Sequence, residues 1–209
     1  GIAMHGEPQL LPDFQHLPYA DPAARKGGRV VLGLQGTFDS LNPFNLKAGS
    51  AAQGLIGPVY QTLMMRSLDE PFTLYGLIAQ RIETNDDRSR VVFHLDPRAR
   101  FSDGSPLTSA DIKFSFQLLG KKGRPQHRAA FQLVKGIETP DERTVAFDLS
   151  GANDRELPLI LALMPVLSAK HTNADTFDNA SLAIPVASGP YVIRQMQPGQ
   201  SIVLERNPS

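Results

Sequence analysis

The sequence predicts an α/β protein in which mixed sheets pack against a few helices, and three observations carry this prediction. Residues 91 to 95 alternate apolar and polar side chains, which is typical of a strand with one buried face. Thr108 precedes Asp111 by three residues at the start of an amphipathic run, as in the capping box of a helix. Residues 29 to 34 read RVVLGL, a continuous apolar strand of the kind found in a well-covered sheet.

The composition is that of a globular protein with balanced charge. Of the 209 residues, 41% are hydrophobic and 20% are charged, and 21 basic residues balance 21 acidic ones. A nucleic-acid-binding protein usually has a basic excess or a basic stripe, so we expect no nucleic-acid partner. The absence of cysteine excludes disulfides, thiolate metal sites and cysteine nucleophiles. No run of about 18 apolar residues occurs, so we expect no membrane span.

The first half of the chain should hold an arm, several strands and one helix. Proline and glycine interrupt the first 28 residues, which predicts an extended arm packed on the body. Asn85-Asp-Asp-Arg88 is a hairpin-type turn. In order, we predict the arm over 1 to 28, a strand over 29 to 34, a helix within 50 to 63 around Gly57-Pro58, strands over 64 to 68 and 78 to 84 joined by a link over 71 to 77, and the strand that begins at Val91.

The second half should alternate helices with strand pairs. Pro158 suits the first turn of an apolar helix, and Pro165 lies near the end of that helix. In order, we predict a helix over 108 to 119, a loop over 120 to 126, a short helix over 129 to 134, strands over 135 to 139 and 144 to 149, a helix over 157 to 167, and strands over 191 to 195 and 202 to 206 joined by a turn at Pro198-Gly199.

The stretch from Val91 to Phe116 carries the most specific pattern. A strand is followed by Phe101-Ser-Asp-Gly-Ser-Pro-Leu-Thr108 and then by Ala110-Asp-Ile-Lys-Phe-Ser115. This order resembles the signature of family 5 extracellular solute-binding proteins, the peptide, nickel and dipeptide receptors of ABC importers, which is close to FHLR…FHDGTPLTADDVxFS. Asp96 stands in place of the usual Arg and Ser102 in place of the usual His.

Further blocks resemble the same family in the same order. Ala187-Ser-Gly-Pro-Tyr191, followed by Gln197-Pro-Gly-Gln200 and IVLERNP, is similar to GTGPY…pGqsivLeRNPdYW. Upstream, GRVVLGL and Ser40-Leu-Asn-Pro43 resemble the first strand and the LDP loop of the family. The segment from His5 to Gly28 resembles the Yej-type oligopeptide-binding subgroup. Together these blocks cover essentially the whole chain.

The resemblance implies the N-terminal lobe of a two-lobed periplasmic binding protein of the type II, peptide-binding class. Family members are more than twice as long, and their motif continues into YW where this chain ends, so we expect the second lobe to be absent. The resemblance places a core sheet subdomain at residues 1–50 and 166–209 and an inserted subdomain at 51–165. The strand at 29 to 34 should then share a sheet with the segments at 189 to 206.

The loop from Gln35 to Asn42 is the expected ligand-facing element, because family members hold an extended peptide partly through main-chain hydrogen bonds. By alignment, Thr37 and Phe38 fall where relatives face the peptide. The alternative is that Thr37 ends a strand and Phe38 belongs to the core. The predicted substrate-binding residues are Gln35, Gly36, Thr37, Phe38, Asp39, Ser188 and Gly189.

Two of these assignments have structural alternatives. Ser188 and Gly189 should lie beside the loop, or they mark a tight crossing that needs a small residue. Asp39 could pair with a ligand ammonium group, although the acid that takes the peptide amino terminus in relatives belongs to the second lobe.

No cofactor, metal site or catalytic residue is expected. The five histidines lie far apart and lack ligand spacing, and His94 on the polar face of a strand suits a structural or exposed role. There is no Gly-x-Ser-x-Gly elbow and no Ser-x-x-Lys. Gly33 and Gly36 follow a strand, but the residues after them do not open a helix that would hold a pyrophosphate.

The resemblance implies the periplasmic substrate-binding component of an ABC importer, with its signal peptide already removed and with no catalysis. Such a protein captures oligopeptides between two lobes and delivers them to permease subunits in the inner membrane. The sequence does not distinguish a cell-wall peptide, a nutrient peptide and a peptide antibiotic as the ligand. The alternative is a truncated receptor fragment that acts as an interaction or self-association module.

Overall fold

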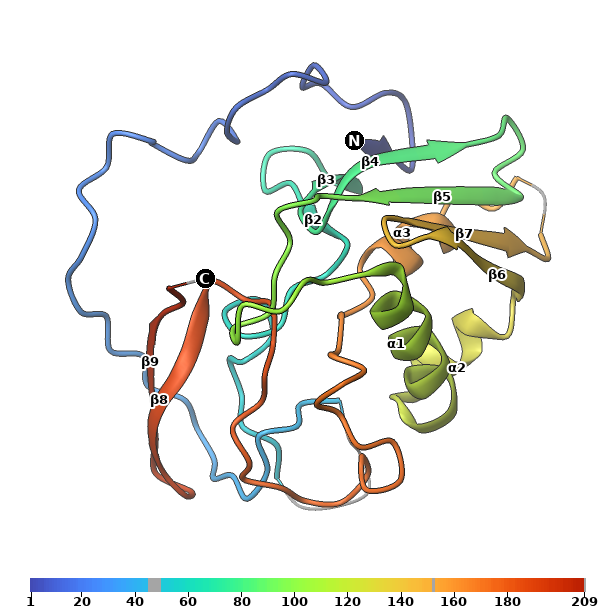
Figure 1. The fold of residues 1–209 in the computed structure, drawn as a ribbon. Coiled ribbons are helices and arrows are strands. Elements are labelled where there is room, and N and C mark those ends of the chain that lie inside the picture. Colours follow the sequence, from blue (N-terminus) through green and yellow to red (C-terminus); the bar gives the residue numbers. More distant parts are fainter. Residues whose placement is uncertain (45–49, 152, 209) are drawn as a thin grey trace.

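The computed structural model describes residues 1–44, 50–151 and 153–208 of the chain. Within these residues the strands form three antiparallel sheets. Figure 1 shows the helices against the four-stranded sheet and the two-stranded hairpin on the other side of the molecule. The predicted α/β class is therefore formed. The division into 1–50 with 166–209 and an inserted 51–165 stays a prediction, and its positions 45–49, 152 and 209 lie outside the described residues.

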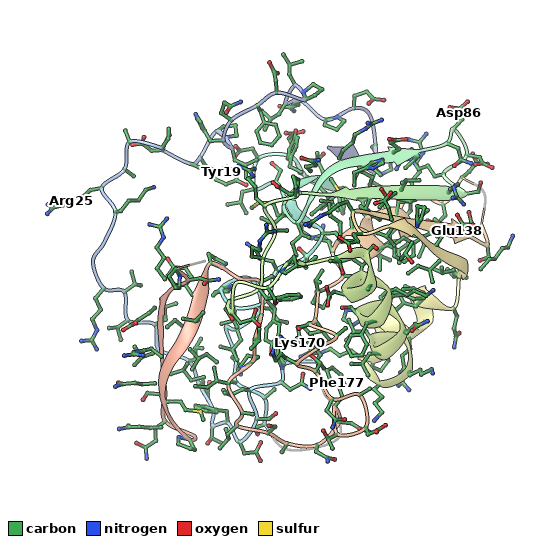
Figure 2. The ribbon with its side chains drawn as sticks, in the orientation of Figure 1. Tyr19, Arg25, Asp86, Glu138, Lys170 and Phe177 are labelled. Atoms are coloured by element: carbon green, nitrogen blue, oxygen red, sulfur yellow. The ribbon has the colours of Figure 1, made fainter. Side chains whose placement is uncertain are left out.

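The largest sheet contains, in spatial order, β4 (Ala79–Thr84), β5 (Arg90–Leu95), β7 (Thr144–Leu149) and β6 (Val134–Asp141). Buried and half-buried side chains alternate along β5, as the sequence predicted, and Phe93 is opposite Val145 of β7. The predicted hairpin turn joins β4 to β5, and Figure 2 shows Asp86 pointing into solvent from its tip.

α1 (Ser109–Lys122) covers one face of this sheet. The N–H of Thr108 donates to Asp111 Oδ2 at 2.9 Å, so the predicted capping box is confirmed. Phe116 of α1 meets Phe147 of β7 edge to face, with ring centroids 5.5 Å apart. Such aromatic pairs contribute about 1 kcal/mol beyond the burial of their area. The alternation along β5 and the capping box at Thr108, which predicted a strand followed by a helix, are therefore both present in the structure.

The two shorter helices differ from their predicted ranges. α2 (Pro125–Phe131) begins earlier than expected because Pro125 suits a first helical turn, and it ends earlier because Val134 already belongs to β6. α3 (Leu157–Ala162) stops before its expected end, since Pro165 cannot donate to a helix and instead forms a bridge with Thr62.

The three-stranded sheet has the order β1 (Ile2–Ala3), β3 (Thr73–Gly76), β2 (Met64–Arg66). The predicted link over 71 to 77 thus contains a strand. Leu74 pairs with Ile2 on one side and Arg66 on the other, and neither partner is visible from the local sequence.

The N-terminal arm is held where it leaves this sheet. The N–H of Leu10 donates to the Tyr75 hydroxyl at 3.0 Å, the N–H of Gln9 donates to Glu70 Oε2 at 3.0 Å, and Tyr75 in turn donates to Glu70. Further along, the ring of Phe14 lies 5.1 Å from that of Tyr75, and the Tyr19 hydroxyl accepts the N–H of Leu68 at 3.3 Å. After these contacts the arm runs in a wide arc, and Figure 2 shows Arg25 pointing away from the body. The arm is extended, as predicted, but only its first part is packed on the fold.

The hairpin of β8 (Tyr191–Gln197) and β9 (Ser201–Arg206) matches the prediction, including the turn at Pro198-Gly199. Gly199 has φ +72°, a conformation that favours glycine. Ile193 is buried in the core, and the other residues of the two strands are half-buried or exposed.

The predicted strand over 29 to 34 is wrong for this structure. Its residues form no strand, and Val30, Val31 and Leu32 are 82%, 76% and 78% exposed. A strand needs a neighbour to pair its backbone, and within the described residues β8 and β9 pair only with each other. The expected sheet joining 29–34 to 189–206 is therefore not formed.

The helix expected within 50 to 63 is also wrong. The described segment is a series of turns and single bridges, including the bridge from Ile56 to Tyr60. Gly54 and Gly57 have φ values of +76° and +94°, which a right-handed helix cannot contain. The apolar side chains of this segment are compatible with a helix, but the positive φ of the two glycines and the fixed φ of Pro58 produce turns instead.

Candidate functional site

The predicted ligand loop lies on the surface beside the turn of the β8–β9 hairpin. Gln35 and Gly36 form an exposed bend, and Gly36 has φ +122°. The hydroxyl of Thr37 donates to the carbonyl of Gly199 at 3.3 Å. This contact anchors the loop at the tip of the hairpin and leaves the main chain of the bend open to solvent.

The next two residues bind the loop to the fold. Phe38 is half-buried and packs against the core. Asp39 Oδ1 accepts the N–H of Ser50 at 2.8 Å, and the N–H of Asp39 donates to the carbonyl of Ser50 at 3.0 Å. The carboxylate of Asp39 therefore has a structural partner in the backbone of Ser50, outside the loop, while the exposed face of the loop belongs to residues 35–37.

Ser188 and Gly189 lie at the base of the hairpin, in a close crossing with residues 58 and 59. The N–H of Gly189 donates to the carbonyl of Val59 at 2.8 Å, and the N–H of Tyr191 donates to the carbonyl of Pro58 at 2.9 Å. A methyl group on Gly189 would overlap the main chain of Pro58 and Val59. The tight crossing that the sequence left as an alternative is therefore present.

The structure does not bring the two halves of the predicted site together. Thr37 contacts Gly199 at the hairpin turn, whereas Gly189 precedes the first residue of β8 at the opposite end. Seven residues of extended strand span roughly 20 Å. The expected proximity depended on a strand over 29 to 34 that is not formed, so the two groups are separate surfaces of one hairpin.

Ser188 and Gly189 instead line an open cleft of about 420 Å³. Asp96, Arg98 and Arg100 form one wall, in the loop that follows β5. The other wall comes from Ser188 to Pro190 and from Arg206 and Asn207 at the end of β9. We call this space the arginine cleft. This cleft is not visible in the sequence, because Arg206 lies 106 positions after Arg100 and only the fold brings the two segments together.

A second cavity of about 350 Å³ lies between Tyr60 and the loop over 168 to 186. Burial raises the pKa of Tyr60. At the edge of this cavity Ser168 Oγ is 3.2 Å from His171 Nδ1, and His171 Nε2 is 3.6 Å from Asp103. This row has the residue types of a hydrolytic triad. However, the Ser168 side chain lies under its own turn in a residue only 1% exposed, so the row joins two loops instead of facing a substrate.

The described residues contain no cluster of three or more His, Asp or Glu side chains that could hold a metal ion. His94 makes a structural contact, with Nε2 2.8 Å from Glu83 on the neighbouring strand. Among the described helices none has the length and apolar character needed to cross a membrane.

Residues 73–209 match the family described as bacterial extracellular solute-binding proteins, family 5. The chain belongs to this family. The family consists of solute-binding proteins, so the expectation of a binding protein and not an enzyme is confirmed, as is the resemblance stated from the sequence.

Relatives and a solved structure place the chain further. It is 46% identical to the peptidoglycan-binding protein YepA of Agrobacterium fabrum, over 100% of this chain and 35% of that protein. It is 36% identical to the probable peptide-binding protein YejA of the same organism, over 99% of this chain and 34% of that protein. The relatives that this chain resembles therefore include a protein of the Yej type, as the sequence predicted. The periplasmic oligopeptide-binding protein of a Thermotoga maritima ABC transporter superposes with a TM-score of 0.69 at 26% identity, over 84% of this chain and 32% of that one.

This structural likeness confirms the predicted fold class, part of a periplasmic binding protein of mixed α/β type. The family 5 chain spans about a third of the length of the relatives it matches.

Proposed function

We propose that this chain is the N-terminal part of a periplasmic receptor that captures oligopeptides between two lobes and delivers them to the permease subunits of an ABC importer. The observation that carries the proposal is the match to a probable peptide-binding protein over 99% of the chain. The solved Thermotoga maritima relative is named as an oligopeptide-binding protein of an ABC transporter, and a second structure of it holds mannohexaose, so it supports the transporter role and not one ligand class.

The surface loop at residues 35–37 suits a peptide ligand. An extended peptide binds largely through main-chain hydrogen bonds, and this bend offers exposed main chain at Gly36 next to the Thr37 hydroxyl. Phe38 is half-buried, so one edge of its ring can cover an apolar side chain of the ligand while the rest stays in the core. We assign Gln35, Gly36, Thr37 and Phe38 to the peptide-facing surface. Asp39 has a structural role, because its carboxylate accepts the N–H of Ser50.

Nuclear magnetic resonance titration of the isotope-labelled 209-residue chain with a mixed oligopeptide pool tests this function. Two walls bury a ligand better than one, so we expect weak binding, with amide shifts concentrated in the bend at 35–38 and absent when free amino acids replace the pool. Thr37→Ala should reduce these shifts. Shifts that are scattered over the surface, or none at millimolar peptide, would count against a peptide receptor.

A second candidate function, self-association, is favoured by one observation. Residues 29–34 expose Val30, Val31, Leu32 and Leu34 in a row, with no strand partner among the described residues. Contiguous exposed apolar side chains usually mark an interaction surface, and an unpaired extended backbone can add to a sheet edge. Sedimentation velocity over a range of concentrations separates the two functions, because a strictly monomeric chain that binds peptide excludes an association module.

A further inference from the structure

We propose that the arginine cleft is a subsite that binds a carboxylate group of the ligand. This inference rests on the proposed function, because it names a chemical group that the captured peptide would present to this chain. It concerns a surface away from the bend at 35–38, so the two can be tested separately.

Contacts between segments that are distant in sequence build the cleft. The N–H of Ser102 donates to the carbonyl of Ala187 at 2.9 Å, which fixes the loop after β5 against the entry to β8. The N–H of Asn207 donates to the carbonyl of Pro190 at 2.8 Å and closes the base of the hairpin. The walls are therefore held by backbone hydrogen bonds, and the volume of about 420 Å³ admits a small polar group.

The charge of the lining is positive. Arg98, Arg100 and Arg206 face a single carboxylate, that of Asp96. Asp96 is already engaged by Arg98, whose Nε and Nη2 lie 3.1 Å and 2.8 Å from its two oxygens, and this bond lowers the pKa of Asp96. The pair is locally neutral, so the charges of Arg100 and Arg206 remain uncompensated within the cleft.

These two guanidinium groups are available to an anion in different ways. Arg100 Nη1 donates to the carbonyls of Pro97 and Ala99 at 2.8 Å and 2.9 Å, which holds the side chain in place without neutralising it. Arg206 is exposed at the end of β9 and takes part in no ion pair among the described residues. The planar fork of arginine matches the two oxygens of a carboxylate.

A buried hydroxyl points to the same ligand. The Ser188 residue is 7% exposed and lines the cleft, and its Oγ has no hydrogen-bond partner among the described residues. A buried polar atom normally has a partner. The Oγ atom is itself buried, so the hydroxyl would rotate toward the cleft to donate a hydrogen bond to an anionic oxygen that pairs with the arginines. The chain as a whole carries no net charge and no basic stripe, which favours a single carboxylate over a polyanion.

The carboxylate has two possible sources in a peptide, its C-terminus and an acidic side chain. Three matched peptides distinguish them: N-acetyl-trialanine as the free acid, the same peptide as the C-terminal amide, and an amidated peptide in which one alanine is replaced by glutamate. Each is titrated into the labelled 209-residue chain while the amides of Arg100, Gly189 and Asn207 are followed.

We expect the amide shifts to give an affinity for the free acid at least about tenfold higher than for the C-terminally amidated peptide. This affinity should fall as the salt concentration rises. If the amidated glutamate peptide binds as well as the free acid, the cleft accepts a carboxylate from either source; if only the free acid binds, the source is the C-terminus. Equal shifts from the free acid and the neutral amide would overturn the inference. Shifts confined to 35–38 would overturn it too, while supporting the proposed function.

Sodium propionate alone separates the two failures. If propionate shifts the cleft amides while no peptide shifts the amides of residues 35–38, the carboxylate subsite is supported and the peptide receptor is not. An unshifted cleft would overturn the subsite.

Arg206→Gln is the decisive variant, because this exposed side chain can be changed without disturbing the core. We expect it to weaken carboxylate binding about tenfold. Arg194→Gln is the matched control, since Arg194 lies on the same hairpin, is also exposed and pairs with Glu205 outside the cleft. Ser188→Ala should weaken binding without loss of the fold. Equal effects of the Arg206 and Arg194 changes would show that general charge, and not the cleft, attracts the anion.

Discussion

Ser102 and Ala187 are joined by two hydrogen bonds although 85 positions separate them. The N–H of Ser102 donates to the carbonyl of Ala187 at 2.9 Å, and the N–H of Ala187 donates to Ser102 Oγ at 3.4 Å. The first residue belongs to the FSDGSP turn and the second to the ASGPY segment, the two motifs that identify the family from sequence. They are therefore one structural unit, and the arginine cleft opens at their junction.

Gly189→Ala should destabilise the fold by about 3 kcal/mol, because the added methyl group would overlap the main chain of Pro58 and Val59. Urea denaturation followed by circular dichroism measures the change. Gly120→Ala is the matched control: its methyl group would lie at an ordinary 3.6 Å from Phe131, and alanine in α1 should add about 0.5 to 1 kcal/mol. Equal stability of both variants would contradict the tight crossing.

Asp111→Asn should cost about 1 to 2 kcal/mol. The two carboxylate oxygens of Asp111 accept separate N–H groups, Oδ2 from Thr108 and Oδ1 from Ala169, each at 2.9 Å. An asparagine can accept only one of them and turns an amide donor toward the other. Thermal unfolding measures the loss, and Asp86→Asn in the exposed turn should leave the melting temperature unchanged. An unchanged melting temperature in Asp111→Asn would contradict the role of this carboxylate as an acceptor of both N–H groups.

Stability should fall as the pH drops through about 6.5. Burial lowers the pKa of His127, and the positive charge of Arg124 lowers it further. The folded state therefore binds this proton less readily than the unfolded state, so stability is full above the unfolded pKa and declines below it. Denaturation at pH 7.5 and pH 5.5 measures the difference, and His127→Phe should reduce it while keeping the stacking on Phe131. His16→Gln, a change in the exposed arm, should leave the difference intact. An unchanged difference in His127→Phe would contradict the assignment.

Replacing Val31 and Leu32 together by lysine should abolish any self-association without lowering stability, because both side chains are exposed in the monomer. Leu68→Lys is the control, since Leu68 is 79% exposed but lies between β2 and β3, outside residues 29–34. Sedimentation velocity reports the association and urea denaturation the stability. Loss of stability in the double variant would show that the segment packs on the fold in solution.

The elements that sequence predicted well are those whose signals are local. The alternation in β5 and the cap at Thr108 each concern residues within a few positions of one another, and both appear as predicted. β3 was missed because its pairing depends on Ile2 and Arg66. The helix within 50 to 63 was wrong because Gly54 and Gly57 adopt positive φ. An apolar pattern alone cannot decide between a helix and a series of turns.

The candidate site shows the same division. The exposed bend at Gly36 follows from its glycine, and the small residues at 188 and 189 do mark a crossing, as one of the two readings had it. Their distance from the bend could not be predicted, because it depended on whether residues 29–34 find a strand partner. The arginine cleft was not visible in the sequence, since Arg100 and Arg206 line one cleft only in the fold, where Ser102 contacts Ala187.

The crossing at Gly189 restricts the residue type at position 189 but not at position 191. The hydrogen bonds of Gly189 and Tyr191 to Val59 and Pro58 use main-chain atoms alone, so they do not depend on the side chain at position 191. Tyr191 is 45% exposed, and a different residue there keeps the same backbone anchor. A different side chain can therefore stand at position 191 without loss of this backbone anchor, whereas position 189 admits only glycine.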